Sequence, residues 1–132
     1  MEEFKFLDAD ERQIEALIKM QYEMRRIQYE AGYPEAEASI ILVEDRAVGR
    51  LLIDESDREV TLVDIALLPE QRNSGIGTRL IRQLLDRAST SAKPVRLQVL
   101  KSSPALRLYQ RLGFVPVAEE SMYVEMKFEP QT

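Results

Sequence analysis

The stretch Gln71-Arg72-Asn73-Ser74-Gly75-Ile76-Gly77-Thr78 decides how this chain folds. It follows an apolar run, Leu62–Leu68, and precedes an amphipathic run, Leu80–Ala88, so the order predicts a strand, a glycine-rich turn and a helix. Two glycines at the start of a helix leave backbone N–H groups accessible, and such a turn can hold a phosphate without a lysine. A plain tight turn, in which glycine supplies a positive φ, fits the same residues.

Two common nucleotide-binding motifs do not fit this turn. The dinucleotide fingerprint G-x-G-x-x-G fails because Leu80 occupies the third glycine position, and the Walker A pattern fails because no G-K-[ST] follows. The pattern that remains is R-x-x-G-x-G, formed by Arg72, Gly75 and Gly77. A nucleotide-binding module is therefore disfavoured.

The composition excludes several kinds of chemistry. The chain has 132 residues, of which 45% are hydrophobic and 31% charged, and this predicts a single domain over residues 1–132. It contains no cysteine and no histidine, so a disulfide framework, a thiolate metal site, a cysteine nucleophile and a Ser-His-Asp arrangement are excluded. We expect no metal ion, and catalysis would depend on carboxylates, Tyr, Lys, backbone N–H groups or water.

Charge and hydropathy also limit the partners. The net charge is −5, which disfavours nucleic acid and weakly favours a cationic substrate. No apolar run reaches transmembrane length, and the acidic start at Met1-Glu2-Glu3 is unlike a signal peptide. We therefore expect no membrane association and a cytoplasmic location.

The rest of the chain alternates between strand and helix patterns without a repeat or a linker. Asp8 and Glu11 form a pattern typical of a capping box before a helix. The order of elements mixes hairpins with crossovers, which predicts an α/β (α+β) fold with a mixed sheet. The predicted strands are Phe4–Leu7, Ser39–Val43, Ala47–Ile53, Val60–Leu68, Val95–Leu100, Phe114–Val117 and Met122–Phe128, and the predicted helices run over Ile14–Ala31, along Leu80–Ala88 and onward from Pro104.

A second motif lies downstream of the turn, in Pro104-Ala105-Leu106-Arg107-Leu108-Tyr109-Gln110-Arg111-Leu112-Gly113-Phe114. Alone, it fits a helix that ends at a glycine with Tyr109 half-buried in the core. Together, in this order and separation, the two motifs resemble the GNAT family of N-acetyltransferases. The stretch Asp64–Gly77 looks like the acetyl-CoA motif of that family, and Pro104–Phe114 looks like its N-P-A-x-x-L-Y-x-x-L-G-F signature.

The resemblance implies the acyl-CoA N-acyltransferase fold, in which helices flank a mixed, mostly antiparallel central sheet. It also implies acetyl-CoA as the acetyl donor. In the family, the backbone of the strand before the turn pairs with the pantetheine arm, and the N–H groups of the turn hold the pyrophosphate. Ser103 stands where the family often has Asn. The implied cofactor-binding residues are Ile65, Ala66, Leu67, Arg72, Asn73, Ser74, Gly75, Ile76, Gly77, Thr78, Ser103 and Tyr109.

The resemblance further assigns catalytic roles. Tyr109 matches the family tyrosine that protonates the departing CoA thiolate. Family members often use an acid on or near the central strand as the base, and Asp64 is the candidate here, with Glu59 and Glu125 as other acids at strand positions. A solvated or arginine-paired carboxylate is the alternative interpretation of Asp64.

The function implied is transfer of an acetyl group from acetyl-CoA to a primary amine by direct attack in a ternary complex. The acceptor is a small molecule or a peptide, and the family allows a homodimer. The resemblance places the helical stretch Ile14–Ala31 beside the acceptor, which makes Tyr22, Arg25, Arg26, Tyr29 and Tyr33 candidate lining residues. The alternative function is a non-catalytic acyl-CoA-binding or regulatory module.

Overall fold

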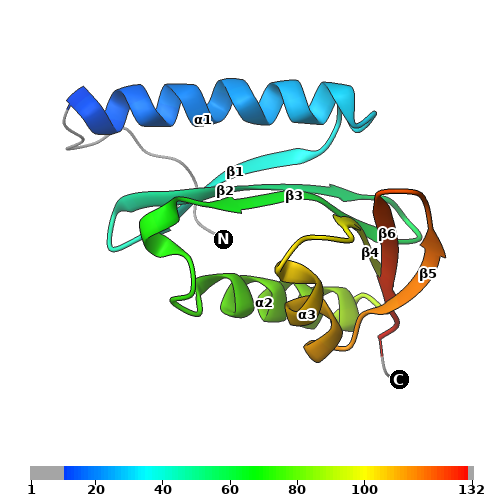
Figure 1. Ribbon diagram of the computed structural model, residues 1–132. Coiled ribbons are helices and arrows are strands. Elements are labelled where there is room, and N and C mark those ends of the chain that lie inside the picture. Colours follow the sequence, from blue (N-terminus) through cyan, green and yellow to red (C-terminus); the bar gives the residue numbers. More distant parts are fainter. Residues whose placement is uncertain (1–10, 131–132) are drawn as a thin grey trace. The chain divides into compact units, whose positions relative to one another are not determined.

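The computed structural model describes residues 11–130, so the predicted first strand at Phe4–Leu7 and the cap residue Asp8 lie outside the described residues. Figure 1 shows the elements in chain order. They are α1 (Glu11–Glu30), β1 (Glu37–Val43), β2 (Arg46–Glu55), β3 (Val60–Leu67), the short 3₁₀ helix η1 (Pro69–Gln71), α2 (Ile76–Thr90), β4 (Val95–Leu100), α3 (Ala105–Arg111), β5 (Val115–Glu119) and β6 (Tyr123–Phe128).

The strands are hydrogen-bonded in the order β1-β2-β3-β4-β6-β5. The pairs β1–β2, β4–β6 and β5–β6 are antiparallel, whereas β3 and β4 run parallel from Val60↔Val95 to Leu62↔Leu97. The predicted α/β class with a mixed, mostly antiparallel sheet is confirmed. The sequence did not predict η1, because Pro69 indicated only that the strand ends there.

The chain divides into two compact units. Within the described residues, the first unit holds the chain up to Asp54 and the segment Val63–Ser74, and the second holds Glu55–Leu62 and the chain from Gly75 onward. The division falls inside β3 and inside the glycine-rich turn. The single-domain assignment stays a prediction.

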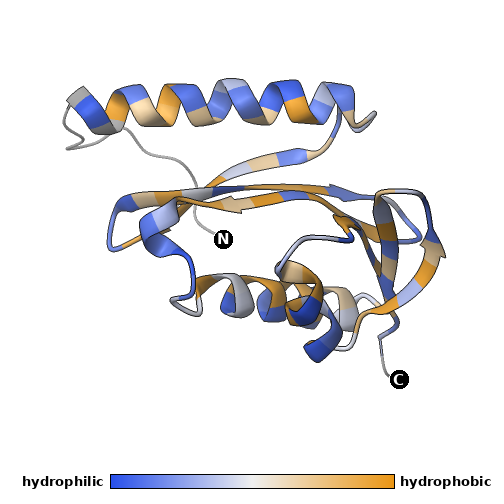
Figure 2. Cartoon of the chain, viewed as in Figure 1, coloured by the Kyte–Doolittle hydropathy of each residue, from blue (hydrophilic) through white to orange (hydrophobic). Residues whose placement is uncertain are grey.

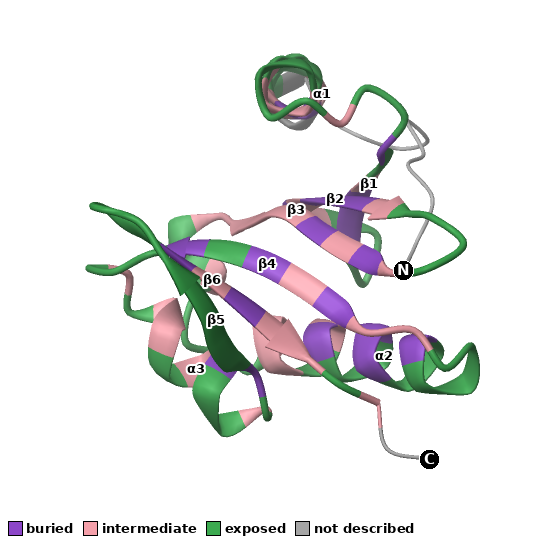
Figure 3. Ribbon diagram, turned by 90° about the vertical axis from the view of Figure 1, so that its right-hand side faces the viewer, coloured by how far each residue is buried: buried purple, intermediate pink, exposed green. Residues whose placement is uncertain are grey.

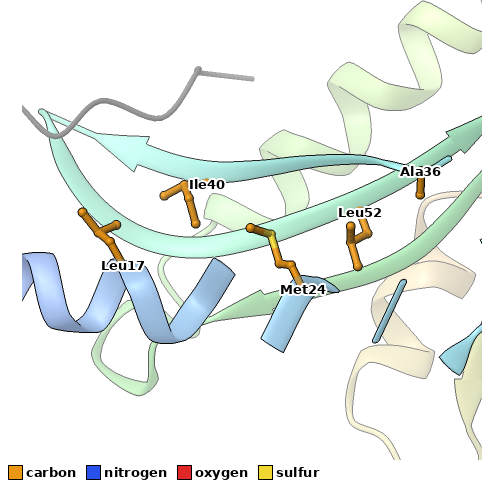
Figure 4. Packing of buried hydrophobic residues seen from close by; sticks show 5 residues of the cluster. All are labelled: Leu17, Met24, Ala36, Ile40 and Leu52. Atoms are coloured by element: carbon orange, nitrogen blue, oxygen red, sulfur yellow. The ribbon is translucent and has the colours of Figure 1, made fainter. Parts of the chain in front are cut away.

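In the first unit, α1 runs alongside β1 and β2 (Figure 1). Leu17 and Met24 lie two turns apart on one face of the helix and point toward Ile40 and Leu52 on the strands (Figure 4). Burying an apolar side chain of this size contributes about 1.5–3 kcal/mol, so these two anchors hold much of the helix in place. Apolar and polar residues alternate along the rest of α1 (Figure 2), as in a helix with one buried stripe.

Close backbone approach fixes β2 against β3 at Gly49. A Cβ atom at this position would collide with the carbonyl oxygen of Ala66 and lie 3.1 Å from the Cα atom of Leu67. Beside it, the Leu68 N–H donates to the Val48 carbonyl at 2.8 Å. Only glycine therefore allows β2 to lie this close to the end of β3.

In the second unit, α2 buries one stripe formed by Ile81, Leu84, Leu85 and Ala88. Phe114 joins α3 to the sheet, since its ring contacts Tyr109 edge-on at 5.7 Å between centroids and Phe128 at 5.8 Å. Figure 3 shows that β5 is exposed along its whole length. Its register against β6 shifts between Pro116 and Ala118.

Candidate functional site

The glycine-rich turn begins in the first unit, directly after β3. The Gln71 N–H donates to the Leu68 carbonyl at 2.9 Å, which closes η1. The Nε–H of Arg72 donates back to the Leu67 carbonyl at 3.2 Å, so this side chain is held beside the end of the strand. Asn73 has a φ of 60°, and Arg72, Asn73 and Ser74 are all exposed. The backbone therefore presents these three residues to solvent.

The turn continues in the second unit as the N-terminus of α2. Gly75 is the N-cap residue in the left-handed region, with φ 84°, and among the described residues no side chain caps this helix end. The first helical hydrogen bond runs from the Arg79 N–H to the Gly75 carbonyl at 3.1 Å. The N–H groups of Ile76, Gly77 and Thr78 precede it and have no carbonyl partner in a helix. This helix end can accept an anion.

Glycine is needed at position 75 for its backbone conformation. A Cβ atom built on Gly75 meets nothing within 4 Å, but the φ of +84° is one that L side chains rarely adopt. The same space is therefore open to a ligand that approaches the helix end.

The C-terminal half of β3 carries the predicted pantetheine-binding residues. Ile65, Ala66 and Leu67 are half-buried in the first unit. On the β2 side, Gly49 lies against Ala66 and Leu67, as described above. The parallel register of β3 with β4 covers Val60–Leu62.

Every acid considered as a base lies in an ion pair with arginine. In the first unit, the Nε–H of Arg50 donates to Asp64 Oδ2 at 2.9 Å, and both side chains are 22% exposed. In the second unit, Arg96 Nε lies 3.3 Å from Glu59 and 3.5 Å from Glu125. The alternative interpretation of Asp64, an arginine-paired carboxylate, therefore describes its position, and its role as a base stays a prediction.

The predicted acid and the residue in the family's Asn position both lie in the second unit, at α3. Tyr109 is 6% exposed, and its ring packs against Phe114. The Ser103 hydroxyl accepts the N–H of Ala105, the first residue of α3, at 3.1 Å. Ser103 therefore has a structural role, and its contact with a cofactor stays a prediction.

A cavity of about 330 Å³ lies in the first unit between α1 and the strands. Lys19, Met20 and Glu23 border it from α1, and Ala66 and Leu67 border it from β3. A neighbouring cavity of about 320 Å³ shares Ala16, Met20 and Leu68 with the first. Both volumes are in the range of small-molecule sites.

The sequence did not identify this face of α1. None of the candidates Tyr22, Arg25, Arg26, Tyr29 and Tyr33 lines either cavity. The α1 positions that do, Arg12, Ala16, Lys19, Met20 and Glu23, include spacings of three and four residues, which places them on one face. The spacing can be read from the sequence. These positions adjoin the apolar stripe of α1, however, and their pattern is also that of the solvent-exposed border of such a stripe.

Among the described residues that line the larger cavity, Glu23 is the only carboxylate. The Arg26 guanidinium, hydrogen-bonded to Glu23 at 2.8 Å, holds the pKa of Glu23 below its usual value, and Arg50 and Lys19 act in the same direction. Glu23 is therefore ionised at neutral pH, and its ion-pair partner Arg26 lies on the same helix and is shared with Glu30.

Comparison with known proteins decides the family. A family model described as acetyltransferase (GNAT) domain matches residues 35–116, which is more than half of the chain. The chain belongs to the GNAT family. The match includes the glycine-rich turn and α3, whereas α1 lies before it.

A curated relative supports this assignment. Thialysine N-epsilon-acetyltransferase from Mus musculus is 34% identical over 74 residues, which are 54% of this chain and 44% of the relative. The chain thus spans less than half the length of this GNAT relative.

Solved GNAT structures share the fold. Ribosomal-protein-S18-alanine N-acetyltransferase from Escherichia coli aligns with a TM-score of 0.70 at 17% identity, over 94% of this chain and 92% of that chain. Ard1 from Thermoplasma volcanium aligns with a TM-score of 0.66 at 23% identity, over 85% and 80%. The PaiA N-acetyltransferase from Thermoplasma acidophilum, solved in complex with coenzyme A, aligns with a TM-score of 0.65 at 16% identity, over 92% and 80%.

Within the described part of the chain, no three Asp or Glu side chains gather where they could hold a metal ion. Among the helices of residues 11–130, none combines the length and hydropathy needed to cross a bilayer.

Proposed function

We propose that this GNAT protein transfers the acetyl group of acetyl-CoA to a primary amine by direct attack in a ternary complex. The observation that carries the proposal is the uncapped N-terminus of α2 behind Gly75, in a chain that belongs to an acetyltransferase family. An uncapped helix end with a positive-φ glycine fits a diphosphate, because its N–H groups and the helix dipole both favour an anion.

The residues of the turn would hold the pyrophosphate. The backbone of Asn73–Thr78 supplies the N–H groups, and Arg72 adds a cation beside them. The Nε–H of Arg72 is already bonded to the Leu67 carbonyl, so the side chain needs little further ordering to reach a phosphate. Ser103 and Tyr109 complete the proposed cofactor residues in the second unit.

The end of β3 would hold the pantetheine arm. Ile65, Ala66 and Leu67 are half-buried, and an extended ligand would pair with those of their backbone groups that do not face β2. The N–H of Leu67 is the donor we assign to the thioester carbonyl, where it would stabilise the negative charge that develops on oxygen.

The cofactor supplies an activated acetyl thioester. The amine nitrogen forms the new C–N bond, the C–S bond breaks, and the thiolate receives a proton from the Tyr109 hydroxyl. A phenol with a pKa of about 10 can protonate a thiolate whose conjugate acid has a pKa of about 8.5 only when it is well positioned, and burial of Tyr109 favours such positioning. Without cysteine or histidine in the chain, direct attack is favoured over an acyl-enzyme.

The proton of the amine needs an acceptor, and we assign Asp64 to this role. Arg50 occupies Oδ2 of Asp64, so the other carboxylate oxygen would accept the proton, directly or through water.

The ion pairs between the candidate bases and arginines favour a second candidate function, a non-catalytic acyl-CoA-binding module. Asp64, Glu59 and Glu125 are all engaged with arginines, which is also what a protein without a catalytic base would show.

One experiment separates the two functions. The protein is incubated with acetyl-CoA and a panel of primary amines while thiol release is followed, and its melting temperature is measured with and without CoA. Amine-dependent thiol release supports the acetyltransferase. A rise in melting temperature without thiol release favours the binding module, and neither response contradicts both.

A further inference from the structure

The larger cavity of the first unit lies against the strand that the proposed function assigns to the thioester. Ala66 and Leu67 line it, and α1 closes its other side through Ala16, Lys19, Met20 and Glu23. An amine must reach the thioester at this strand in order to react. The cavity is therefore the space in the first unit where the acceptor would lie, and the following inference depends on the proposed function.

Among the described residues that line the two cavities, cations outnumber carboxylates, although the chain as a whole carries −5. Two of the charged lining residues have ion-pair partners outside the cavities: Glu23 pairs with Arg26, which Glu30 shares, and Arg50 pairs with Asp64. The remaining charged lining residues have no ion pair with any described side chain, and they are the cations Arg12, Lys19, Arg46 and Arg72 and the single carboxylate Glu70. A purely cationic acceptor such as a polyamine would be repelled here.

Arg50 lines the larger cavity and has hydrogen-bond donors left for an anion. Asp64 accepts a hydrogen bond from the Nε–H of Arg50 at 2.9 Å. The side chains of both residues are 22% exposed, so the guanidinium is held in a partly buried position. A guanidinium has five N–H donors, and within residues 11–130 the donors on Nη1 and Nη2 have no partner. These two nitrogens form the end of the group that binds a carboxylate through two parallel hydrogen bonds.

We propose that the acceptor is a small amine that also carries a carboxylate, as an amino acid does, and that Arg50 and Lys19 bind this carboxylate. Asp64 then acts as a positioning residue for Arg50, in addition to the role assigned to it above. Arg72 is assigned to the cofactor and is not needed for this contact. The positive side chains at the cavity would thus attract the carboxylate of the acceptor, although the protein as a whole is negatively charged.

Matched substrate pairs test the proposal. Each pair consists of an amino acid and the amine that remains when its carboxylate is removed: lysine and cadaverine, ornithine and putrescine, phenylalanine and phenethylamine, leucine and isopentylamine. Thiol release from acetyl-CoA gives kcat and KM for each member. We expect the preferred amino acid to exceed its matched amine in kcat/KM by at least about tenfold, the scale of one charge-assisted hydrogen bond.

Two variants locate the contact. Lys19→Gln should raise KM for the amino acid, leave kcat nearly unchanged, and leave the matched amine unaffected. Arg50→Gln should raise KM more for the amino acid than for the matched amine, and it should lower kcat for both, because it also removes the partner of the proposed base Asp64. Lys19→Gln is the safer variant for folding, because Lys19 is exposed on α1, whereas Arg50→Gln leaves Asp64 without its partner. Arg25→Gln removes the same charge from an exposed position of the same helix that lines neither cavity, and it is the control.

The outcomes separate this inference from the proposed function. Equal or greater activity toward the amines that lack a carboxylate, or an equal loss for both members of a pair in Lys19→Gln, overturns the inference and leaves the acetyltransferase intact. Acetyl-CoA binding without thiol release from any pair also counts against the inference. Failure to bind acetyl-CoA at all overturns the proposed function, and the inference falls with it.

Discussion

The helices α1 and α2 show how differently the two units are built. Helix α1 has 20 residues, and Leu17 and Met24 are its buried anchors. Helix α2 has only 15 residues but buries four, namely Ile81, Leu84, Leu85 and Ala88. Cavities of about 330 and 320 Å³ border α1, whereas the cavity described beside α2, next to Val60, measures about 60 Å³.

The difference fits separate roles for the two helices in binding the cofactor and the acceptor. Four buried side chains anchor α2, which suits a site for a constant part of a ligand such as a diphosphate. The loosely bordered face of α1 leaves room for a variable ligand, and α1 also lies outside the residues matched by the GNAT family model. We therefore assign cofactor binding mainly to the turn and acceptor choice to α1.

Substitution of Gly75 should produce the largest effect. In Gly75→Val a β-branched side chain is forced to a φ near +84° and fills the open space before α2, so we expect CoA binding to be lost in calorimetry. Gly32→Val is the matched control, since Gly32 has φ +81° and equally open surroundings at the end of α1. Both variants should lose stability, but only the first should lose CoA, and normal CoA binding by Gly75→Val would remove the turn from the site.

Tyr109→Phe tests the chemistry assigned to the second unit. We expect kcat to fall by about 10²–10⁴-fold, the usual contribution of a general acid, while affinity for CoA changes little because the ring contact with Phe114 is kept. Steady-state kinetics and calorimetry measure the two effects. Tyr123→Phe, at a 40% exposed position on β6, is the control. Unchanged turnover in Tyr109→Phe would exclude it as the acid.

Gly49→Ala tests the rigid part of the first unit. The added Cβ meets the Ala66 carbonyl oxygen, so we expect a loss of about 1–3 kcal/mol in urea unfolding, as for overpacked cores. Leu67 Cδ2 is also close, at 3.0 Å, but it is a flexible side-chain atom. A double variant with Leu67→Ala should therefore not recover stability. Recovery would show that the side chain, and not the backbone, causes the clash.

The smallest effect concerns an ion pair at the surface of the second unit. Lys93 donates to Glu55 at 2.7 Å and holds the pKa of Glu55 below its usual value of 4.5. Because the pKa is lowered by folding, the pair stabilises the protein above about pH 4.5, and the contribution disappears as the pH falls through the folded-state pKa.

Glu55→Gln should therefore lower the free energy of unfolding at pH 7 by about 0.2–1 kcal/mol, the range of exposed pairs, and by less at pH 3. Urea unfolding at both pH values measures this difference. Glu35→Gln, whose carboxylate has no ion pair with the described side chains, should show no such pH dependence. An equal loss at both pH values would mean that Glu55 acts through packing and not through its charge.

Much of the fold was predictable because its signals are local. The amphipathic run Leu80–Ala88 and the strand Val95–Leu100 follow hydrophobic periodicity, and both are present in the structure. Gly113 was predicted to end a helix and has φ 103° just after α3. The ends of elements were less accurate: α2 begins at Ile76, inside the predicted turn, because an N-cap glycine needs no polar side chain to start a helix.

The parts of the site that depend on tertiary contacts were not predictable. The partners of Asp64 and Glu125 come from other strands, so their arginines, Arg50 and Arg96, became known only from the structure. The cavity beside α1 depends on which face of the helix turns toward β2 and β3. Gly49 attracted no interpretation in the sequence, because only its distance from Ala66 shows why it must be glycine.

The exposed strand β5 affects how copies of this protein behave in solution. A strand at the end of a sheet can add another strand from a neighbouring molecule, which is a common start of aggregation. Here Pro116 lacks an N–H donor, and the register shift before Ala118 interrupts the ladder. Val115 and Val117 can therefore remain 54% and 46% exposed at an edge that is a poor template for further strands. We therefore expect Pro116 to weaken the pairing of further strands along this edge.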